Sequence, residues 1–286
     1  MSPIGAHVSI KDGYAGAFQE ALGLGASALQ LFGKSPMSGK LREVTVAEGK
    51  EVASLPDRKK IRYAVIHASY LLNFAKKLPA GSYQARSLSE DLRGADKLGA
   101  DGVVLHMGKS VDGDRLEAEN HFVTHIVSLL KETSDLKAKI ILENTAGQGT
   151  EMGFQFEEYD RIYKKIKKLA GKEQARLAMC LDTAHAYGAG YDLRTKAGCA
   201  KTLDELDRHI GLEEIACVHF NDSKKALGSR VDRHQDLGHG TIGNTGLHAF
   251  VEALDKARTK PTPLILETPQ EHVSYAKQLK LLANWV

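Results

Sequence analysis

The sequence is poor in cysteine, with only Cys180, Cys199 and Cys217 among 286 residues. None of the three belongs to a Cys-x-x-Cys pair, so neither a thiolate metal motif nor a disulfide framework is indicated. No apolar run approaches the roughly 20 residues of a membrane span, and the first expected strand begins at Ile4, which leaves no room for a signal peptide. We therefore expect a reduced, cytoplasmic location and no membrane partner.

Aromatic residues are also scarce, at 6% of the chain with Trp285 as the single tryptophan. A stacking platform for single-stranded nucleic acid is therefore not evident. The 42% of hydrophobic and 26% of charged residues are typical of a globular protein. The net charge of +3 permits a polyanionic partner without requiring one.

Short apolar and β-branched runs alternate along the chain with longer segments of helical character. Eight such runs are expected to be strands, each followed by enough chain for a crossover helix. Eight βα units in about 250 residues are typical of a (β/α)₈ TIM barrel, so we expect one α/β domain over residues 1–286. A doubly wound open sheet is the alternative fold. The expected strands are Ile4–Val8, Ala28–Phe32, Tyr63–Ile66, Gly102–Leu105, Lys139–Leu142, Leu177–Leu181, Ile215–Val218 and Pro263–Leu266.

Side chains able to bind metal stand directly after six of these runs. Successive positions differ by 39, 37, 39, 37 and 48 residues, and a nearly constant interval without a repeated sequence indicates a repeated topology. The C-terminal ends of barrel strands share the face where active sites form, whereas an open sheet would spread them along a line. The six residues are His67, His106, Glu143, Asp182, His219 and Glu267.

Three further residues extend this set. His185 lies three residues after Asp182, and in a helical turn such side chains lie roughly 5–6 Å apart, a spacing that suits two neighbouring ions. The longest interval contains a loop, 220–243, in which Asp232 and His234 are two residues apart and would point to one side of an extended chain. With His185 they would form a third metal site.

Each of these nine residues, taken alone, is better explained as a cap, a core histidine or a salt-bridge partner. Five histidines and four carboxylates at one mouth would be costly to assemble without metal, because like charges repel and buried imidazoles need partners. Such ligands suit Zn²⁺, Mn²⁺ or Fe²⁺. Three divalent ions carry more positive charge than the four carboxylates neutralise, and the remaining positive charge would attract a phosphodiester. This charge balance favours phosphoester hydrolysis over sugar isomerisation.

A basic run lies between Asp160 and Arg176, where four lysines surround Ile162 and Ile166. It could indicate nucleic-acid binding, but the spacing favours the solvated face of an outer barrel helix.

Seven stretches, spread over nearly the whole chain, resemble the endonuclease IV family of apurinic/apyrimidinic endonucleases. The most specific are the one that contains Asp182 and His185 and the one that contains Asp232 and His234. The stretches are GAHVS, VIHASYLLNFA, LENTAGQGTEMGF, CLDTAHAYGAGYDLRT, VHFNDSK, GSRVDRHQDLGHGTIG and PLILETP.

The resemblance implies a TIM barrel with three zinc ions and Glu143 as the catalytic carboxylate that bridges two of them. His67 and His106 would hold the first ion together with Glu143. The second ion would be held by Glu143, Asp182, His219 and Glu267, and the third by His185, Asp232 and His234.

The resemblance also implies the reaction and the partner. A monomeric hydrolase of base excision repair would cut the phosphodiester 5′ to an abasic site in duplex DNA, leaving a 3′-hydroxyl and a 5′-deoxyribose phosphate, and would trim 3′ ends. Tyr70 and Leu71 match a Tyr-Leu pair that would enter the DNA at the lesion. Further DNA contacts are expected from Lys34, Lys40, Lys224, Arg230 and Arg233.

One segment and three single positions depart from the family pattern without removing a metal ligand. The segment 33–40 lacks the arginine and the aromatic residue that family members use to invade DNA, and Met107, His239 and Ala68 replace a proline, a glutamate and an aspartate. These departures bear on the contacts with DNA. The competing functions are a metal-dependent sugar isomerase or epimerase on a related barrel, which would not need Asp232 and His234, and a non-catalytic protein that binds damaged DNA or stores metal.

Overall fold

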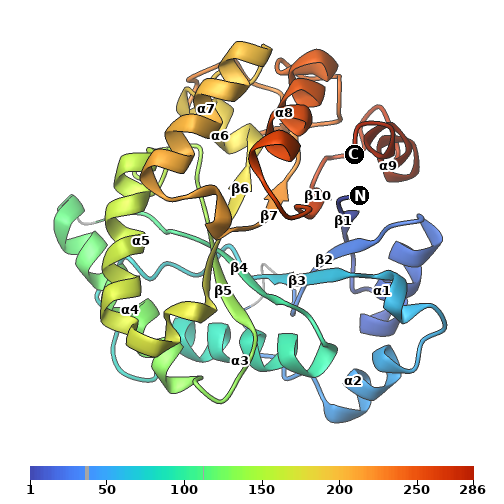
Figure 1. The fold of residues 1–286 in the computed structure, drawn as a ribbon. Helices are drawn as coiled ribbons and strands as arrows, with labels where there is room; N and C mark the ends of the chain where they lie inside the picture. The colour runs from blue at the N-terminus through green and yellow to red at the C-terminus, as the bar shows by residue number, and fades with distance from the viewer. Residues whose placement is uncertain (36–38, 112) are drawn as a thin grey trace.

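The computed structural model describes residues 1–35, 39–111 and 113–286. Within them, eight parallel strands close into a barrel in the order β1-β10-β7-β6-β5-β4-β3-β2, surrounded by helices (Figure 1). The expectation of a (β/α)₈ TIM barrel is therefore confirmed, and the open sheet is excluded. The strands are β1 (Ile4–Val8), β2 (Ala28–Phe32), β3 (Tyr63–His67), β4 (Gly102–His106), β5 (Lys139–Glu143), β6 (Leu177–Asp182), β7 (Ile215–His219) and β10 (Leu264–Leu266).

Five strands run one residue further than the sequence predicted, so each includes its metal-capable residue as its last member. The ladder continues through these positions, as the register pairs His106 with Glu143 and Asp182 with His219. Main-chain hydrogen bonds of the sheet therefore fix the backbone of these residues. At the other end of the barrel, β10 begins at Leu264 and not at Pro263, whose nitrogen has no hydrogen to donate.

The strands are buried on both faces, as parallel barrel strands must be. Small and β-branched residues such as Ala28, Val65 and Val104 fill the interior of the barrel, together with the thiols of Cys180 and Cys217. A larger apolar layer lies between the strands and the helices. The helices are α1 (Gly13–Gly23), α2 (Val46–Ala53), α3 (Tyr83–Leu98), α4 (Arg115–Glu132), α5 (Phe156–Ala170), α6 (Thr183–Ala189), α7 (Lys196–His209), α8 (Gly243–Ala257) and α9 (Tyr275–Ala283), with 3₁₀ turns η1 (Arg58–Lys60), η2 (Gly171–Arg176) and η3 (Leu212–Glu214).

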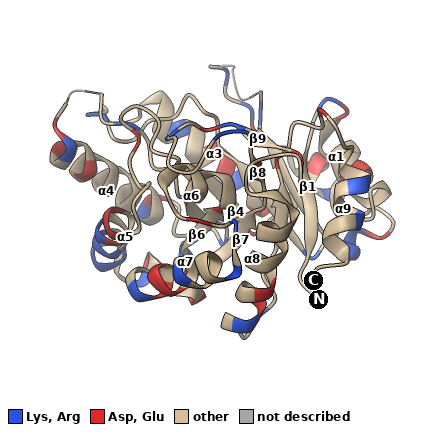
Figure 2. Ribbon diagram, turned by 90° about the horizontal axis from the view of Figure 1, so that it is seen from above, with Lys and Arg blue, Asp and Glu red and all other residues tan. Residues whose placement is uncertain are grey.

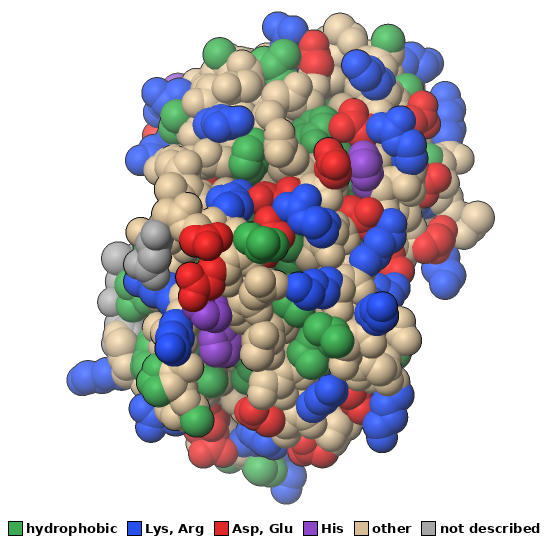
Figure 3. Space-filling model, turned by 90° about the vertical axis from the view of Figure 1, so that its left-hand side faces the viewer, with side chains coloured by type: hydrophobic (Ala, Val, Ile, Leu, Met, Phe, Trp, Pro, Cys, Tyr) green, Lys and Arg blue, Asp and Glu red, His purple; other side chains and the backbone are tan. Residues whose placement is uncertain are grey.

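The basic run belongs to the outer face of α5. Ile162 and Ile166 are buried, whereas Lys164 pairs with Asp160 and Lys167 pairs with Glu214. On the face that Figure 3 presents, Lys and Arg side chains are interspersed with Asp and Glu. These contacts confirm the interpretation as a solvated helix face.

The loop after β7 is folded around the carboxylate of Asp222. A short antiparallel hairpin, β8 (Asp222–Ser223) with β9 (His234–Gln235), lies at the end of the barrel opposite the two termini (Figure 2). The Asp222 carboxylate accepts hydrogen bonds from the backbone N–H groups of Gly238, Gly240 and Ile242. A Cβ at Gly240 would lie 2.4 Å from Asp222 Oδ1, so only glycine fits there. The hairpin places Asp232 and His234 over the barrel mouth.

Among the described residues, no helix combines the length and the apolar character needed to cross a membrane.

Candidate metal centre

The nine side chains predicted to bind metal converge at the mouth of the barrel. Six come from the C-terminal ends of strands, His185 comes from α6, and Asp232 and His234 come from the segment that enters β9. Eight of the nine fall into three groups whose ligand atoms lie within 4.8 Å of one another in each group. Group 1 is His67, His106 and Glu143; group 2 is Glu143, Asp182, His219 and Glu267; group 3 is Asp182, His185 and His234, with Asp232 in contact.

In group 1, two imidazoles face one carboxylate oxygen. The Nε2 atoms of His67 and His106 lie 3.3 and 3.2 Å from Glu143 Oε2, yet this buried oxygen accepts no hydrogen bond from the described residues. His67 Nδ1 lies 2.7 Å from the Ala68 carbonyl oxygen, to which it must donate. The neutral ring then presents a lone pair from Nε2, as a metal ligand does.

In group 2, one imidazole nitrogen faces three carboxylates. His219 Nδ1 lies 2.9 Å from Glu143 Oε1, 3.1 Å from Glu267 Oε2 and 4.0 Å from Asp182 Oδ2. Burial opposes the charged ring, but Glu267 and Glu143 raise the pKa of His219 to about 10 in the metal-free protein. Glu143 therefore directs one oxygen to group 1 and the other to group 2.

Group 3 combines Asp182 and His185, from β6 and α6, with residues of the loop after β7. His185 Nε2 and His234 Nε2 lie 3.2 and 3.4 Å from Asp232 Oδ1. His185 Nδ1 lies 2.9 Å from the carbonyl oxygen of Asn144, so a hydrogen on Nδ1 is donated there and Nε2 is the atom that would offer a lone pair to a metal ion in the group. Burial would raise the pKa of Asp232, but the imidazoles of His185 and His234 hold it well below its usual range.

Asp182 has more partners than the sequence analysis predicted. Its Oδ1 accepts from the backbone N–H of His185 at 2.7 Å and caps α6. Its Oδ2 lies 3.5 Å from His234 Nε2 and also faces His219, so this oxygen borders groups 2 and 3. The capping and ligand interpretations of Asp182 are therefore compatible, because each uses a different oxygen.

Two asparagines that the sequence analysis did not select hold these ligands in place. Asn221 donates to Asp182 Oδ2 at 2.8 Å and accepts from the backbone N–H of Glu267 at 2.8 Å. Asn144 accepts from the backbone N–H of Asp182 at 2.7 Å. Only their closeness to predicted ligands in the sequence could have indicated them, since Asn144 follows Glu143 directly and Asn221 lies two residues after His219.

The arrangement fits divalent cations. Glu143 Oε2, His185 Nε2 and His234 Nε2 are buried without a hydrogen-bond partner among the described residues, although each has ligand atoms of neighbouring residues nearby. Such atoms are rare in folded proteins because losing water without a partner costs free energy. Ions coordinated by imidazole and carboxylate would partner all three, and this ligand set suits Zn²⁺, Mn²⁺ or Fe²⁺.

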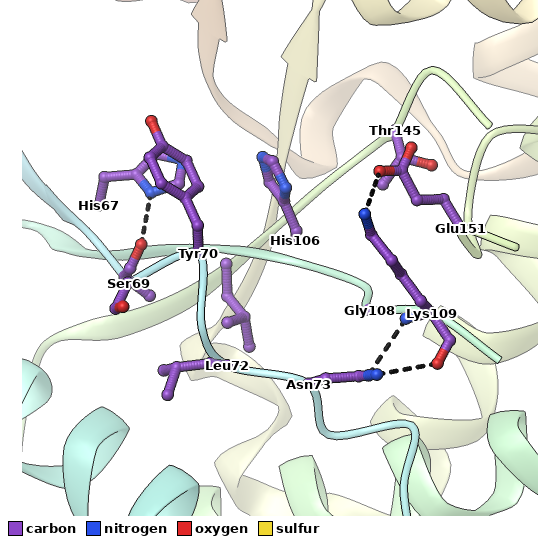
Figure 4. A pocket seen from close by; sticks show the side chains of 12 residues that line it. His67, Ser69, Tyr70, Leu72, Asn73, His106, Gly108, Lys109, Thr145 and Glu151 are labelled. Carbon is purple, nitrogen blue, oxygen red and sulfur yellow. Dashed lines mark hydrogen bonds and ion pairs between the residues drawn. The ribbon is translucent and has the colours of Figure 1, made fainter. Parts of the chain in front are cut away.

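Tyr70 and Leu71, the residues expected to enter the DNA, project from the mouth. Their exposed fractions are 56% and 45%, whereas the next residue, Leu72, is buried. The Tyr70 ring lies beside the imidazoles of His67 and His106, with centroids 5.3 and 6.1 Å apart (Figure 4). Asn73 ties this segment to the loop after β4 through two hydrogen bonds with the backbone of Lys109.

The structure contradicts the expectation that Lys34 contacts a DNA phosphate. The Lys34 side chain is only 3% exposed, and its ammonium lies 2.5 Å from Asp91 Oδ1 on α3. Residues 36–38 of the same segment lie outside the described residues, and Lys40 is exposed. The sequence pattern did not reveal Asp91 as a partner because that residue is 57 positions away.

The remaining predicted contacts lie on the loop that carries group 3. Lys224 pairs with Glu271 at 3.0 Å, Arg230 stacks over the ring of Phe154, and Arg233 donates to the carbonyl of Asp232. All three basic side chains are exposed, and their contact with DNA stays a prediction. Among the departures from the family pattern, Met107 is buried, and His239 stacks on His272 with ring centroids 4.9 Å apart.

Comparisons with known proteins agree with this geometry. The family described as "Xylose isomerase-like TIM barrel" matches residues 18–285. Two proteins named "Probable endonuclease 4" are similar: one from Methanosphaera stadtmanae is 33% identical over 99% of this chain and 98% of its own length, and one from Chloroflexus aurantiacus is 34% identical over 94% and 92%.

This chain is also similar to solved structures. The crystal structure of endonuclease IV from Thermus thermophilus aligns with a TM-score of 0.81 and 36% identity, covering 99% of this chain and 98% of that one. A D-tagatose 3-epimerase-like protein aligns with a TM-score of 0.71 over 99% of this chain and 96% of its own, but at 19% identity, so it shares the fold alone.

Proposed function

Because the chain belongs to the endonuclease IV family of deoxyribonuclease IV-type hydrolases, we propose that it hydrolyses the phosphodiester on the 5′ side of an abasic site in duplex DNA. The products would be a 3′-hydroxyl and a 5′-deoxyribose phosphate, and the same centre would trim blocked 3′ ends. We further propose that residues 1–286 act as one domain and as a monomer in base excision repair.

The proposal rests on the presence of group 3 beside groups 1 and 2, which share Glu143. Two neighbouring groups bridged by a carboxylate suit an in-line displacement at phosphorus, and the third would stabilise charge on the leaving oxygen. When bound, divalent ions supply Lewis-acid activation of phosphoryl oxygens and lower the pKa of water. A sugar isomerase or epimerase has no need of Asp232 and His234.

The residues of the chain have distinct tasks in this scheme. Glu143 directs one oxygen to each of two groups and so sets their spacing. The carbonyls of Ala68 and Asn144 orient His67 and His185 toward the groups.

Recognition of the lesion falls to the exposed pair Tyr70 and Leu71. Their exposed apolar surface would fill the gap in the DNA. Extruding an abasic nucleotide costs little free energy because it has no base to unstack. Exposed basic residues of the group 3 loop would contact phosphates and fix the register of the duplex.

One assay tests the proposal directly. Metal-loaded protein is incubated with a duplex that carries a single tetrahydrofuran abasic analogue, and the ends of the products are analysed. We expect incision on the 5′ side with a 3′-hydroxyl. Because this analogue cannot undergo β-elimination, such a product would identify hydrolysis. An intact duplex, or epimerisation of a ketose without incision, would contradict the proposal.

A second measurement tests the metal content. Elemental analysis of protein purified without chelator should give about three ions per chain, mostly zinc.

A further inference from the structure

A glutamine inside the barrel joins two of the group 2 residues. Gln30 lies on β2, two residues after the barrel-interior residue Ala28, and is fully buried. Its side-chain amide contacts the carboxylate of Glu267, the imidazole of His219 and the imidazole of His7. The sequence gives no sign of this role for Gln30, because one polar residue in an apolar strand carries little information.

The charge of Glu267 fixes the orientation of this amide. An ionised carboxylate can only accept hydrogen bonds, so Gln30 must direct its NH₂ group toward Glu267 Oε1. The second hydrogen of that NH₂ group is directed at His7 Nδ1, 2.9 Å away. The amide oxygen then faces His219 Nε2 at 2.8 Å, so this nitrogen must carry a hydrogen. All the donors of the buried amide and its oxygen therefore have partners.

This orientation determines the tautomer of His219. A neutral imidazole that carries its hydrogen on Nε2 has its lone pair on Nδ1, and Nδ1 is the atom that faces Glu143, Glu267 and Asp182. The same amide holds Glu267 Oε1, so the other oxygen, Oε2, faces group 2 at 3.1 Å from His219 Nδ1. The Gln30 side chain thus orients two ligands, His219 and Glu267.

Two other imidazoles of the mouth are oriented by the main chain. His67 and His185 use backbone carbonyls, which no substitution can remove. His219 uses a side chain, so its orienting group can be replaced.

We propose that Gln30 is a positioning residue for the metal ion of group 2, because it fixes the His219 tautomer and the Glu267 rotamer that this ion requires. The inference rests on the proposed function, since it takes group 2 to hold metal. Partners of this kind, which hydrogen-bond a ligand without touching the ion, change metal affinity by about 10–100-fold when they are lost.

The test measures zinc affinity and does not depend on incision. Gln30→Met preserves the volume and removes all three hydrogen bonds. Metal-free wild type and variant are titrated with zinc against a chromophoric chelator. We expect one of the three ions to bind about 10–100-fold more weakly in the variant, with the other two unchanged. Thr133→Val, at a buried hydrogen-bonding residue remote from the mouth, is the matched control and should leave all three affinities unchanged.

A double-mutant cycle assigns the weakened ion to His219. In a His219→Gln background, Gln30→Met should lower zinc affinity by a smaller factor than in wild type, because the contact with His219 is already lost and only the contact with Glu267 remains to be removed. Fully additive losses, or zinc affinities in Gln30→Met equal to those of wild type, would overturn the inference. Failure of wild type itself to bind a second ion would instead contradict the proposed function.

A spectroscopic signal separates positioning from packing. In zinc-loaded wild type labelled with ¹⁵N-histidine, the Nε2–H of His219 should give a slowly exchanging proton resonance that disappears in Gln30→Met. Gln30→Glu keeps an acceptor for this hydrogen but sets a carboxylate against Glu267, so the resonance should persist while zinc affinity falls. The Glu variant also provides the zinc test if the Met variant does not fold, and unchanged affinity in it would count equally against the inference.

Discussion

Glu143 is the residue on which two of the three groups depend. Glu143→Gln replaces one carboxylate oxygen by an amide nitrogen that cannot ligate a cation, while the residue stays at the mouth, beyond the packed layers of the barrel. We expect the fold and part of the DNA affinity to persist and kcat for abasic-site incision to fall by roughly 10³-fold or more, since metal activation is worth several kcal/mol.

Single-turnover incision and circular dichroism of the two proteins check this result. Glu117→Gln, at an exposed residue of α4, is the control and should behave as wild type. A Glu143→Gln enzyme with wild-type turnover would disprove the bridging role.

His185 and Asp232 form a pair whose two members should be equivalent. Their facing atoms lie 3.2 Å apart, and each would lose the same ion if replaced. We expect His185→Ala and Asp232→Ala to lose similar activity, and the double variant to be scarcely worse than either single variant, because residues that act as a unit are not additive. Incision rates of the four proteins give the coupling directly, and additive losses would assign separate tasks to the two residues.

The loop after β3 carries the exposed pair Tyr70 and Leu71, and its contribution to binding should be apolar. Tyr70→Ala with Leu71→Ala should raise KM on abasic duplex strongly and leave metal content unchanged, because unstacking DNA costs a few kcal/mol per step that a wedge offsets. Lys40→Ala with Arg233→Ala should weaken binding modestly and flatten its dependence on salt, as expected for phosphate contacts. Affinity measured from about 50 to 200 mM salt separates the two effects, and a larger loss in the basic pair would refute the wedge.

The loop after β2 is fastened to helix α3 by the buried pair of Lys34 and Asp91. Burial raises the pKa of Asp91 to about 6, although Lys34 opposes the rise. Lys34→Met would leave a buried carboxyl without its cation and should lower the free energy of unfolding by roughly 3–5 kcal/mol. The double variant Lys34→Met, Asp91→Leu removes both charges, so its free energy of unfolding should be close to that of wild type.

The pH dependence of this effect has a defined sign. An acid whose pKa is raised in the folded state binds its proton more tightly there, so stability falls as pH rises from the ordinary value near 3.8 through the folded value. Lys34 lowers this pKa, so its removal in Lys34→Met raises the pKa of Asp91 further, and the stability lost relative to wild type should be larger at pH 8 than at pH 5 in urea unfolding. Lys60→Met, which breaks an exposed pair with Asp57, should cost under about 1 kcal/mol.

At the scale of the whole molecule, metal ions and protons would compete for the same ligand atoms at the barrel mouth. Burial lowers the pKa of His106, His185 and His219, but the surrounding carboxylates outweigh it, so in the metal-free protein the pKa of each is raised, that of His219 to about 10. Raised values stabilise the metal-free fold below the ordinary pKa of histidine, and this stabilisation is lost as pH rises toward 10. Zinc bound to these imidazoles would replace the protons.

Zinc should therefore raise Tm, since a ligand that binds only the folded state stabilises it. The increase should grow from pH 6 to pH 9, because fewer protons have to be displaced at the higher pH. Scanning calorimetry with chelator and with zinc at each pH measures it, and a Tm shift that shrinks with pH would contradict the competition.

The sequence by itself determined the barrel and the composition of its mouth. Alternation of apolar runs with helical segments reflects the burial of every strand on both faces, and a nearly constant interval placed His67, His106, Glu143, Asp182 and His219 at equivalent points of successive βα units. These patterns are local and periodic, so they can be read without coordinates.

Only the tertiary structure decided which atoms face one another. It showed that one oxygen of Asp182 caps α6 while the other borders two groups, that Lys34 is buried against Asp91, and that Gln30 contacts His219 from 189 residues away. Each of these contacts depends on the direction of a hydrogen bond or on the closure of the barrel. Such contacts leave no period in the sequence, because hydrogen-bond geometry acts between side chains that only folding brings together.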